Sequence, residues 1–219
     1  MKIAVMGTGR VGHVIANKLL ALGHEVRMGS RSATNDKAAA FASSHAAASA
    51  GSFADAAAWC ELAFNCTAGV ASLEALGGLD ESLADKVLVD LANPLDFSQG
   101  MPPRLSLCND DSVGEQLQKA LPRAKVVKSL NTMNCEIMVE PSKLEGEHVV
   151  FVCGEDQGAK AQVRSLLSEG FGWRDTQIMD LGGIAQSRGT EMFLPLWVRM
   201  WGALGTGDFN IQIARAQGS

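Results

Sequence analysis

The sequence predicts an α/β fold, built on a mostly parallel, doubly wound sheet with a small helical extension at the C-terminal end. Short runs of apolar and β-branched residues alternate with segments of helical periodicity along most of the chain, which is typical of parallel strands covered by helices on both faces. The glycine-rich turn Gly7-Thr8-Gly9-Arg10-Val11-Gly12 lies between the first such run and the first helical segment. This order of strand, turn and helix predicts a Rossmann-type fold.

The first three elements are expected to form a βαβ unit. Residues 2–6 are apolar without alternation, as in a strand that is buried on both faces. Apolar residues then recur at helical spacing from Val11 to Leu22, and Gly23 marks the end of that helix. A second strand is expected over residues 25–28, which completes the unit within about 30 residues.

The remaining elements follow the same alternation with less definition. Residues 96–111 contain Gly100, Pro102 and Pro103 without any periodicity, and we expect them to form a functional or mobile loop. After residue 183 the chain is expected to be helical and unusually apolar. The predicted helices are residues 38–50, 52–59, 70–76, 113–121 and 159–167, and the predicted strands are a short segment after residue 50 and residues 61–66, 86–91, 125–130, 148–153 and 176–179.

Charge and hydropathy argue against two classes of partner. The 219 residues include 19 Lys and Arg against 24 Asp and Glu, a net charge of −5, and no basic run exceeds two residues. Nucleic-acid binding needs a basic patch, so we expect none. The longest apolar stretch, residues 192–204, contains Arg199 and is shorter than the ~20 residues of a membrane span. Since the N-terminal apolar run is also too short for a signal peptide, we expect no membrane partner and a cytoplasmic location.

The cysteine and histidine positions predict neither disulfides nor a metal site. The five cysteines are scattered without a CxxC pair, and the four histidines share no ligand spacing with them, so reduced thiols are expected. We expect His13 on a helix surface. Lys128 lies in a predicted buried strand and is expected to be paired or to reach toward solvent, the alternative being a catalytic amine. We assign no catalytic residue and no metal ligand.

The turn after the first strand predicts a nucleotide site. Gly7 permits a tight turn, Gly9 lets a pyrophosphate approach the backbone, and Gly12 allows the helix to pack closely on the strand. The start of the following helix offers unpaired N–H groups and a positive dipole end. The alternative is a glycine-rich turn that binds nothing.

The end of the second strand favours NADP(H) over NAD(H). Sites for NAD(H) place Asp or Glu there, to accept a hydrogen bond from the ribose 2′-hydroxyl. This chain has Ser30, Arg31 and Ser32 instead, with no carboxylate nearby. A guanidinium flanked by hydroxyls suits a 2′-phosphate, although an Arg in an ordinary turn would be solvated in the same way.

Small and amide side chains follow three further predicted strands, where the carboxyl ends of parallel strands meet. They are Asn65-Cys66-Thr67-Ala68, Asn93-Pro94 and Asn131-Thr132. We expect these strand ends to lie beside the ribose and nicotinamide, although each alone could equally form a turn. The small residues Ala68 and Gly69 are expected to leave room for an acceptor ring against the nicotinamide.

Five segments, GTGRVG, LGHEVRMGSR, LANPLD, VVKSLNTM and IMDLGGIAQSRGTEMFLPLWVRM, keep their order from residue 3 to about residue 201. They resemble the NADPH-dependent coenzyme F420 reductase family, which looks related to the oxidoreductase domain of the STEAP metalloreductases. The resemblance implies that Gly7, Thr8, Gly9, Arg10 and Val11 bind the pyrophosphate, that Ser30 and Arg31 bind the 2′-phosphate, and that Thr67, Ala68, Asn93, Pro94 and Asn131 flank the ribose and nicotinamide.

The leading hypothesis is an NADP-dependent oxidoreductase that transfers hydride between NADP(H) and a planar acceptor such as a deazaflavin (coenzyme F420) or a flavin. This reaction needs two rings held face to face and no strong acid or base from the protein, in agreement with a chain that lacks tyrosine. One alternative is a non-catalytic module that senses NADP(H). The other is a small imine or hydroxyacid reductase, although such enzymes carry a larger helical domain than the residues after Cys153 could form.

We predict two parts of the chain, an NADP-binding domain over residues 1–153 and a small C-terminal extension over residues 154–219. The extension is expected to complete the acceptor cleft and to form the surface of a homodimer. The basis for the dimer is that one predicted helix is apolar around much of its circumference, more than a monomer usually exposes. The residues concerned are Phe193, Leu194, Leu196, Trp197, Met200, Trp201 and Leu204.

Overall fold

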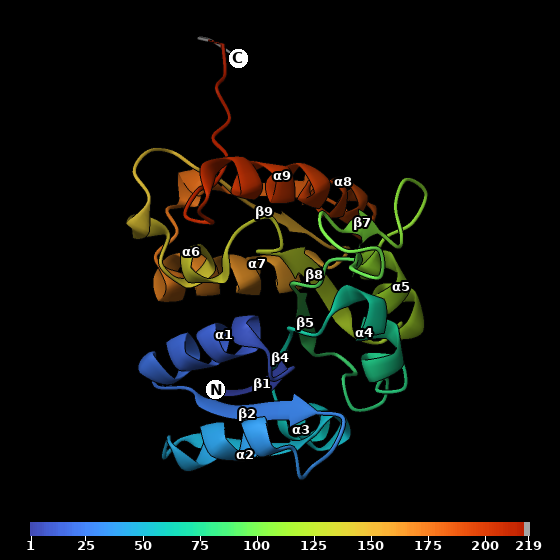
Figure 1. Cartoon of the computed structure of the whole chain (residues 1–219). Coiled ribbons are helices and arrows are strands. Elements are labelled where there is room, and N and C mark those ends of the chain that lie inside the picture. The colour runs from blue at the N-terminus through green and yellow to red at the C-terminus, as the bar shows by residue number, and fades with distance from the viewer. Residues whose placement is uncertain (217–219) are drawn as a thin grey trace.

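The computed structural model describes residues 1–216, which form one large sheet with helices on both faces and a separate two-stranded hairpin (Figure 1). In chain order the strands and α-helices are β1 (Lys2–Met6), α1 (Arg10–Ala21), β2 (Glu25–Ser30), α2 (Asp36–Ser43), β3 (Ala48–Ser52), α3 (Phe53–Trp59), β4 (Leu62–Asn65), α4 (Gly69–Leu76), β5 (Val87–Asp90), β6 (Leu95–Asp96), β7 (Arg104–Leu105), α5 (Val113–Ala120), β8 (Lys125–Ser129), α6 (Cys135–Val139), β9 (Val150–Cys153), α7 (Gln157–Ser165), β10 (Ile178–Gly182), α8 (Ser187–Met192) and α9 (Leu194–Leu204). Short 3-10 helices span Pro141–Lys143, Asp175–Gln177 and Ile184–Gln186, and a π-helix spans Leu166–Phe171.

The sheet has the strand order β10-β9-β8-β5-β4-β1-β2-β3. Neighbouring strands are parallel, except that β8 and β9 are antiparallel. The predicted fold class is therefore confirmed: a Rossmann-type, mostly parallel, doubly wound sheet with a helical C-terminal region.

The alternation of side chains along the central strands divides the core between the two faces of the sheet. In β1, Ile3 and Val5 pack with residues of α1, α2, α6 and α7, whereas Ala4 and Met6 pack with residues of α3, α4 and α5. All four side chains are fully buried. Because both faces are covered, β1 reads in the sequence as a continuous apolar run.

The predicted helix over residues 38–50 is too long. α2 ends at Ser43, and β3 begins at Ala48, where it pairs with Val26 of β2. The alanines of this segment favour a helix by intrinsic propensity, but pairing with the edge of the sheet overrides that preference. Ser52 then caps α3 through a capping box with Asp55, which fixes the boundary between strand and helix.

Two other segments differ from the prediction. Residues 96–111, expected as a loop without structure, contain the β7 strand of the β6–β7 hairpin, with Arg104 Nε 2.8 Å from Asp96 Oδ2. α6 was not predicted, because five residues are too few to display helical periodicity. It packs against α1 and adds Ile137, Met138 and Val139 to the core.

Strand β10 belongs to the predicted extension, yet it pairs with β9 in the main sheet. The boundary at residue 153 therefore falls between two neighbouring strands, and the division into two functional parts stays a prediction. After α9, the chain returns to the residues just before β9, where the Val149 N–H donates to the Ile211 carbonyl at 3.0 Å. His148 forms an isolated bridge with Gln212 and is buried, in line with a structural role.

Across residues 1–216, no helix combines the length and the apolar character of a membrane span. Nor does that part of the chain bring three or more His, Cys, Asp or Glu side chains together in a way that could hold a metal ion. The cysteines are free thiols, and four of the five are buried or partly buried.

Candidate functional site

The carboxyl ends of β1 and β4 mark the place where the strand order reverses. β1 lies between β2 and β4, and the chain enters β4 only after completing β3 at the far edge of the sheet. In open parallel sheets, ligands bind in the crevice outside such a switch point. A cleft of about 500 Å³ opens there, lined by Gly7, Thr8, Gly9, Ser30, Arg31, Asn35, Phe53, Cys66, Thr67, Ala68, Ala71, Glu74 and Ala75.

The three glycines of the β1–α1 turn differ in what surrounds them. Gly7 has a φ of +122°, and a Cβ atom there would lie 2.7 Å from the Cys66 carbonyl oxygen. A Cβ at Gly12 would lie 2.3 Å from the Gly7 carbonyl oxygen, whereas one at Gly9 would meet nothing within 4 Å. The turn and the helix packing thus require glycine at positions 7 and 12. The backbone at Gly9 stays open to a ligand.

The start of α1 is suited to a phosphate group. Gly9 occupies the N-cap position without a side-chain cap, and the first N–H groups of a helix have no partner within the helix. The His13 ring packs edge-on against Phe41, and its Nδ1 lies 3.0 Å from the Gly9 carbonyl oxygen. His13, expected on the surface, is therefore half-buried and holds the first helical turn.

Three of the five residues predicted to bind the pyrophosphate line the cleft, namely Gly7, Thr8 and Gly9. The Arg10 side chain instead lies over a neighbouring hollow and pairs with Glu136, with Nη2 3.4 Å from Oε1. Val11 packs against the core, and Gly12 is buried inside the turn, so that neither residue lines the cleft.

At the end of β2, Ser30 and Ser32 are joined by a hydrogen bond, whereas the Arg31 side chain has no polar partner among the described residues. The Ser30 hydroxyl donates to the Ser32 carbonyl at 2.6 Å, and the Ser32 hydroxyl lies 2.9 Å from that of Thr34. In the part of the chain that is described, the exposed Arg31 guanidinium makes no hydrogen bond or ion pair. The geometry therefore offers one uncommitted cation at the end of β2. Ser32 shapes the turn and does not line the cleft.

Five lining residues were missed by the sequence analysis: Asn35, Phe53, Ala71, Glu74 and Ala75. Asn35 follows the Ser-Arg pair and caps α2 through its side chain. Phe53 begins α3, and the other three lie on α4. Their spacing from Ala68 is helical, so one face of α4 forms this wall of the cleft. This helical periodicity after Ala68 is the sequence feature from which the α4 residues could have been predicted.

Buried polar side chains hold the β4–α4 turn in place through hydrogen bonds. Asn65 Oδ1 accepts hydrogen bonds from the Thr67 N–H at 3.1 Å and from the Thr67 hydroxyl at 2.7 Å. The Thr67 hydroxyl also lies 2.8 Å from that of Ser72 on α4. Burial raises the pKa of the Cys66 thiol, which therefore stays protonated at neutral pH and is no nucleophile.

Asn93 and Asn131 are brought together, but they do not line the cleft of about 500 Å³. Asn131 Nδ2 donates to Asn93 Oδ1 at 2.9 Å, and Asn93 Nδ2 donates to the Asn131 carbonyl at 2.8 Å. The paired amides thus join the segments after β5 and β8. Pro94 anchors the hairpin, because its carbonyl accepts from the Ser106 N–H at 2.8 Å.

Gly69 does not provide the open space that was expected of it. A Cβ atom at this position would lie 2.2 Å from the Asn93 carbonyl oxygen and 2.8 Å from the Pro94 nitrogen. The Gly69 N–H also donates to the Asn93 carbonyl at 3.2 Å. Glycine is needed here because α4 begins directly against the segment after β5. Only Ala68 of this pair lines the cleft.

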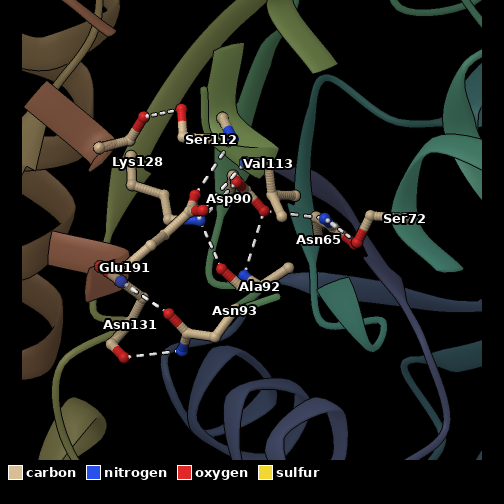
Figure 2. A network of polar contacts seen from close by, with 12 residues as sticks. Asn65, Ser72, Asp90, Ala92, Asn93, Ser112, Val113, Lys128, Asn131 and Glu191 are labelled. Atoms are coloured by element: carbon tan, nitrogen blue, oxygen red, sulfur yellow. Dashed lines mark hydrogen bonds and ion pairs between the residues drawn. The ribbon is translucent and has the colours of Figure 1, made fainter. Parts of the chain in front are cut away.

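Lys128 is paired, as expected, and its partners form a buried network beneath these loops (Figure 2). Its ammonium lies 2.8 Å from Asp90 Oδ2 and 2.7 Å from Glu191 Oε1. Burial alone would lower the pKa of Lys128, but the two carboxylates raise it above its ordinary value. Lys128 is therefore a permanent buried cation and is unsuited to act as a catalytic amine.

Similar proteins point to one family. The family model for NADP oxidoreductase, coenzyme F420-dependent, matches residues 2–94. The F420-dependent NADP reductase of Methanocaldococcus jannaschii is 31% identical over 140 residues, which make up 62% of this chain and 61% of that protein. The metalloreductase STEAP3 of Rattus norvegicus is 29% identical over 126 residues, 56% of this chain and 23% of that protein. The chain thus matches less than two thirds of either of these relatives.

Solved structures extend the likeness over the whole fold. A crystal structure from Arthrobacter sp. FB24, named as a candidate F420-dependent NADP reductase, is 50% identical with a TM-score of 0.91, over 98% of this chain and 100% of that one. The imine reductase of Myxococcus stipitatus in complex with NADP⁺ shares the fold alone, with 14% identity and a TM-score of 0.66 over 94% of this chain and 63% of that one. This chain belongs to the family of coenzyme F420-dependent NADP oxidoreductases.

Proposed function

We propose that the protein transfers hydride between NADP(H) and a planar acceptor such as a deazaflavin, coenzyme F420, or a flavin. The observation that carries the proposal is the cleft of about 500 Å³ at the switch point, with an open glycine backbone at one place and an uncommitted arginine at another. Its volume falls within the range of about 300–1,000 Å³ usual for small-molecule sites. The names of the relatives at 31% and 50% identity point to the same chemistry.

The residues around the cleft suit the pyrophosphate and adenosine parts of NADP(H). The N–H groups at the start of α1, beside Gly9, would hold the pyrophosphate. Arg31 would pair with the 2′-phosphate, and the absence of a carboxylate from Ser30 to Ser32 removes the group that favours NAD(H). The α4 face with Ala71 and Ala75 supplies apolar surface for the adenosine end.

The nicotinamide end would lie past Thr67 and Ala68, toward the amide pair of Asn93 and Asn131. In this arrangement Ala68 keeps one ring face free of side chains. The β6–β7 hairpin and the helical segment of residues 184–201 would wall the acceptor cleft beside it. Bound NADPH supplies the hydride, and the protein holds the two rings at the ~3–3.5 Å that the transfer needs.

The experiment is an NADPH oxidation screen against deazaflavin, FMN, FAD, quinones, ferric chelates and cyclic imines, followed at 340 nm. Oxidation by a deazaflavin or a flavin, faster than without protein, is the expected result. Binding of NADPH without turnover on any of these acceptors would indicate a sensing module instead. Oxidation only by cyclic imines would favour the reductase alternative.

We also propose a homodimer formed through α8 and α9. Leu196 is 54% exposed, Trp201 42% and Leu204 59%, and Met192 at 38% extends the same stripe. Such a set of large apolar side chains at helical spacing is rarely left in water by a monomer. A second copy of the chain is the occupant that we propose for it.

We place the protein in the cytoplasm. The five cysteines are free, and two of them, Cys60 and Cys153, are buried thiols whose pKa burial raises. Free thiols persist in reducing compartments.

A further inference from the structure

The network around Lys128 connects three parts of the chain that meet at the carboxyl edge of the sheet (Figure 2). The Lys128 and Asp90 side chains have no exposed surface, and that of Glu191 has 2%. An ammonium group has three N–H donors. Here they go to Asp90, to Glu191 and to the carbonyl oxygen of Ala92, so the cation is fully satisfied without water.

The first arm leads from Asp90 to the nucleotide cleft. Asp90 Oδ1 accepts a hydrogen bond from Asn65 Nδ2 at 2.8 Å. Asn65 Oδ1 in turn holds the N–H and the hydroxyl of Thr67, which lines the cleft. Asn65 Nδ2 also donates to Ser72 on α4 at 3.1 Å. The turn after β4 is thus tied to the buried charges through one fully buried amide.

The second arm pins the main chain after β5. Ala92 is held at both of its polar groups: its carbonyl accepts from Lys128, and its N–H donates to Asp90 Oδ1 at 3.1 Å. The next residue is Asn93, whose amide pairs with Asn131. The orientation of this amide pair therefore depends on the charges at Asp90 and Lys128.

The third arm belongs to the C-terminal region. Glu191 on α8 accepts from the N–H groups of Val113 at 2.9 Å and Gly114 at 3.2 Å, the first two residues of α5. A helix start stabilises a carboxylate through its dipole. Burial raises the pKa of Glu191, and Lys128 and the Val113 N–H oppose the rise.

We propose that Lys128, Asp90 and Glu191 are positioning residues for the nicotinamide end of the cofactor: they fix Thr67 and the Asn93–Asn131 pair in the places where that ring would lie. This inference rests on the proposed function. The stability of the fold does not require such a network, because a buried ion pair often stabilises a protein no more than apolar residues of similar volume would. Its place at the ends of β4, β5 and β8, beside the switch point, is where ligands bind in this fold.

The test separates the two ends of the cofactor. Calorimetry measures the binding of two ligands, NADPH and adenosine 2′,5′-bisphosphate, of which the second lacks the nicotinamide. The proteins compared are the wild type, Lys128→Met and Asp90→Asn. Asp90→Asn keeps the side-chain volume but places an amide NH₂ against one of the groups that donate to Asp90. This variant allows the test to be made if Lys128→Met does not fold. The matched control is Glu115→Gln, which breaks the ion pair with Arg188 between the same helices, α5 and α8, but has no bond to Asp90 or Ala92.

The expected result is that the Kd for NADPH rises about tenfold in each network variant that folds. The Kd for the bisphosphate should stay within about twofold, and the control should leave the ratio of the two constants unchanged. A merely structural network would lower the melting temperature and leave this ratio at the wild-type value in the folded variants, which would overturn the inference. If the wild type binds NADPH but reduces no acceptor, the proposed function fails, and the ratio still decides the role of the network.

Discussion

Gly69→Ala is the substitution for which the structure gives the sharpest expectation. The added Cβ would lie 2.2 Å from the Asn93 carbonyl oxygen, 2.4 Å from its carbon and 2.8 Å from the Pro94 nitrogen. These distances are about 1 Å or more short of van der Waals contact. All three atoms belong to the main chain, so no side chain can turn away to make room. Either the start of α4 or the segment after β5 must move.

Such a shift would also break the hydrogen bond from the Gly69 N–H to the Asn93 carbonyl. Overpacking of this kind costs about 1–3 kcal/mol, against a gain of at most about 1 kcal/mol from replacing glycine by alanine in a helix. A net loss of about 1–2 kcal/mol would lower the melting temperature by about 2–8 °C in a domain of this size.

The assay is thermal unfolding followed by circular dichroism, with Gly78→Ala as the matched control. Gly78 follows α4, and a Cβ atom there would meet nothing within 4 Å. We expect the control to melt within about 1 °C of the wild type. A Gly69→Ala protein that melts at or above the wild-type temperature would refute the steric argument, and the contact of α4 with the segment after β5 would have to be looser than described.

Three further predictions concern the proposed site and its surroundings. Arg31→Ala should weaken NADP(H) binding by about 1.5–3 kcal/mol, the size of one charge-assisted contact, and leave NAD(H) binding nearly unchanged; equal wild-type affinities for the two nucleotides would contradict it. Ala68→Trp should abolish hydride transfer and spare binding of adenosine 2′,5′-bisphosphate, and unchanged turnover would place the nicotinamide elsewhere. Trp201→Glu should convert a dimer to a monomer by light scattering at micromolar concentration, whereas a wild type that is already monomeric would rule the dimer out.

Reactivity of the cysteines gives a test that needs no ligand. Burial raises the pKa of Cys153 to about 12, and Cys60 and Cys66 are shifted in the same direction, so these thiols stay protonated and unreactive at pH 8. Cys108 is exposed. Iodoacetamide at pH 8 should therefore modify Cys108 first, as read by peptide mass spectrometry. Equally fast labelling of Cys153 in the folded protein would contradict the buried position of β9.

The elements that the sequence predicted well are those in which one local feature decides the conformation. Gly7 needs a positive φ, and Gly12 must lie against the turn, so their spacing alone identified the β1–α1 junction. The segment of residues 44–50 failed for the opposite reason. Its alanines favour a helix locally, and only the exposed edge of β2, whose position in the fold a sequence does not reveal, converts the end of the segment into β3.

The candidate site divides in the same way. Main-chain positions such as Gly9 and the turn at Thr67 follow from the order of strand, turn and helix, which is written in the sequence. The sequence predicted that Lys128 is paired, but it did not identify the partner residues. Asp90 becomes its neighbour because β5 and β8 lie side by side in the register Asp90↔Lys128, and Glu191 arrives from a helix beyond the last strand. Pairing of this kind depends on strand order, which helical and strand periodicity do not encode.

The partners of Lys128 also explain why the cleft should respond to changes made far from it. Thr67 and Ala92 belong to loops after two different strands. Thr67 is held through Asn65, which donates to Asp90, and Ala92 is bonded directly to Asp90 and Lys128. A substitution on α8 at Glu191 would leave Lys128 paired with Asp90 but with one unsatisfied buried donor, at a cost of about 1–3 kcal/mol. In the proposed arrangement, the C-terminal helices therefore set the geometry beside the nicotinamide together with the glycine-rich turn, although the turn alone carries the recognisable motif.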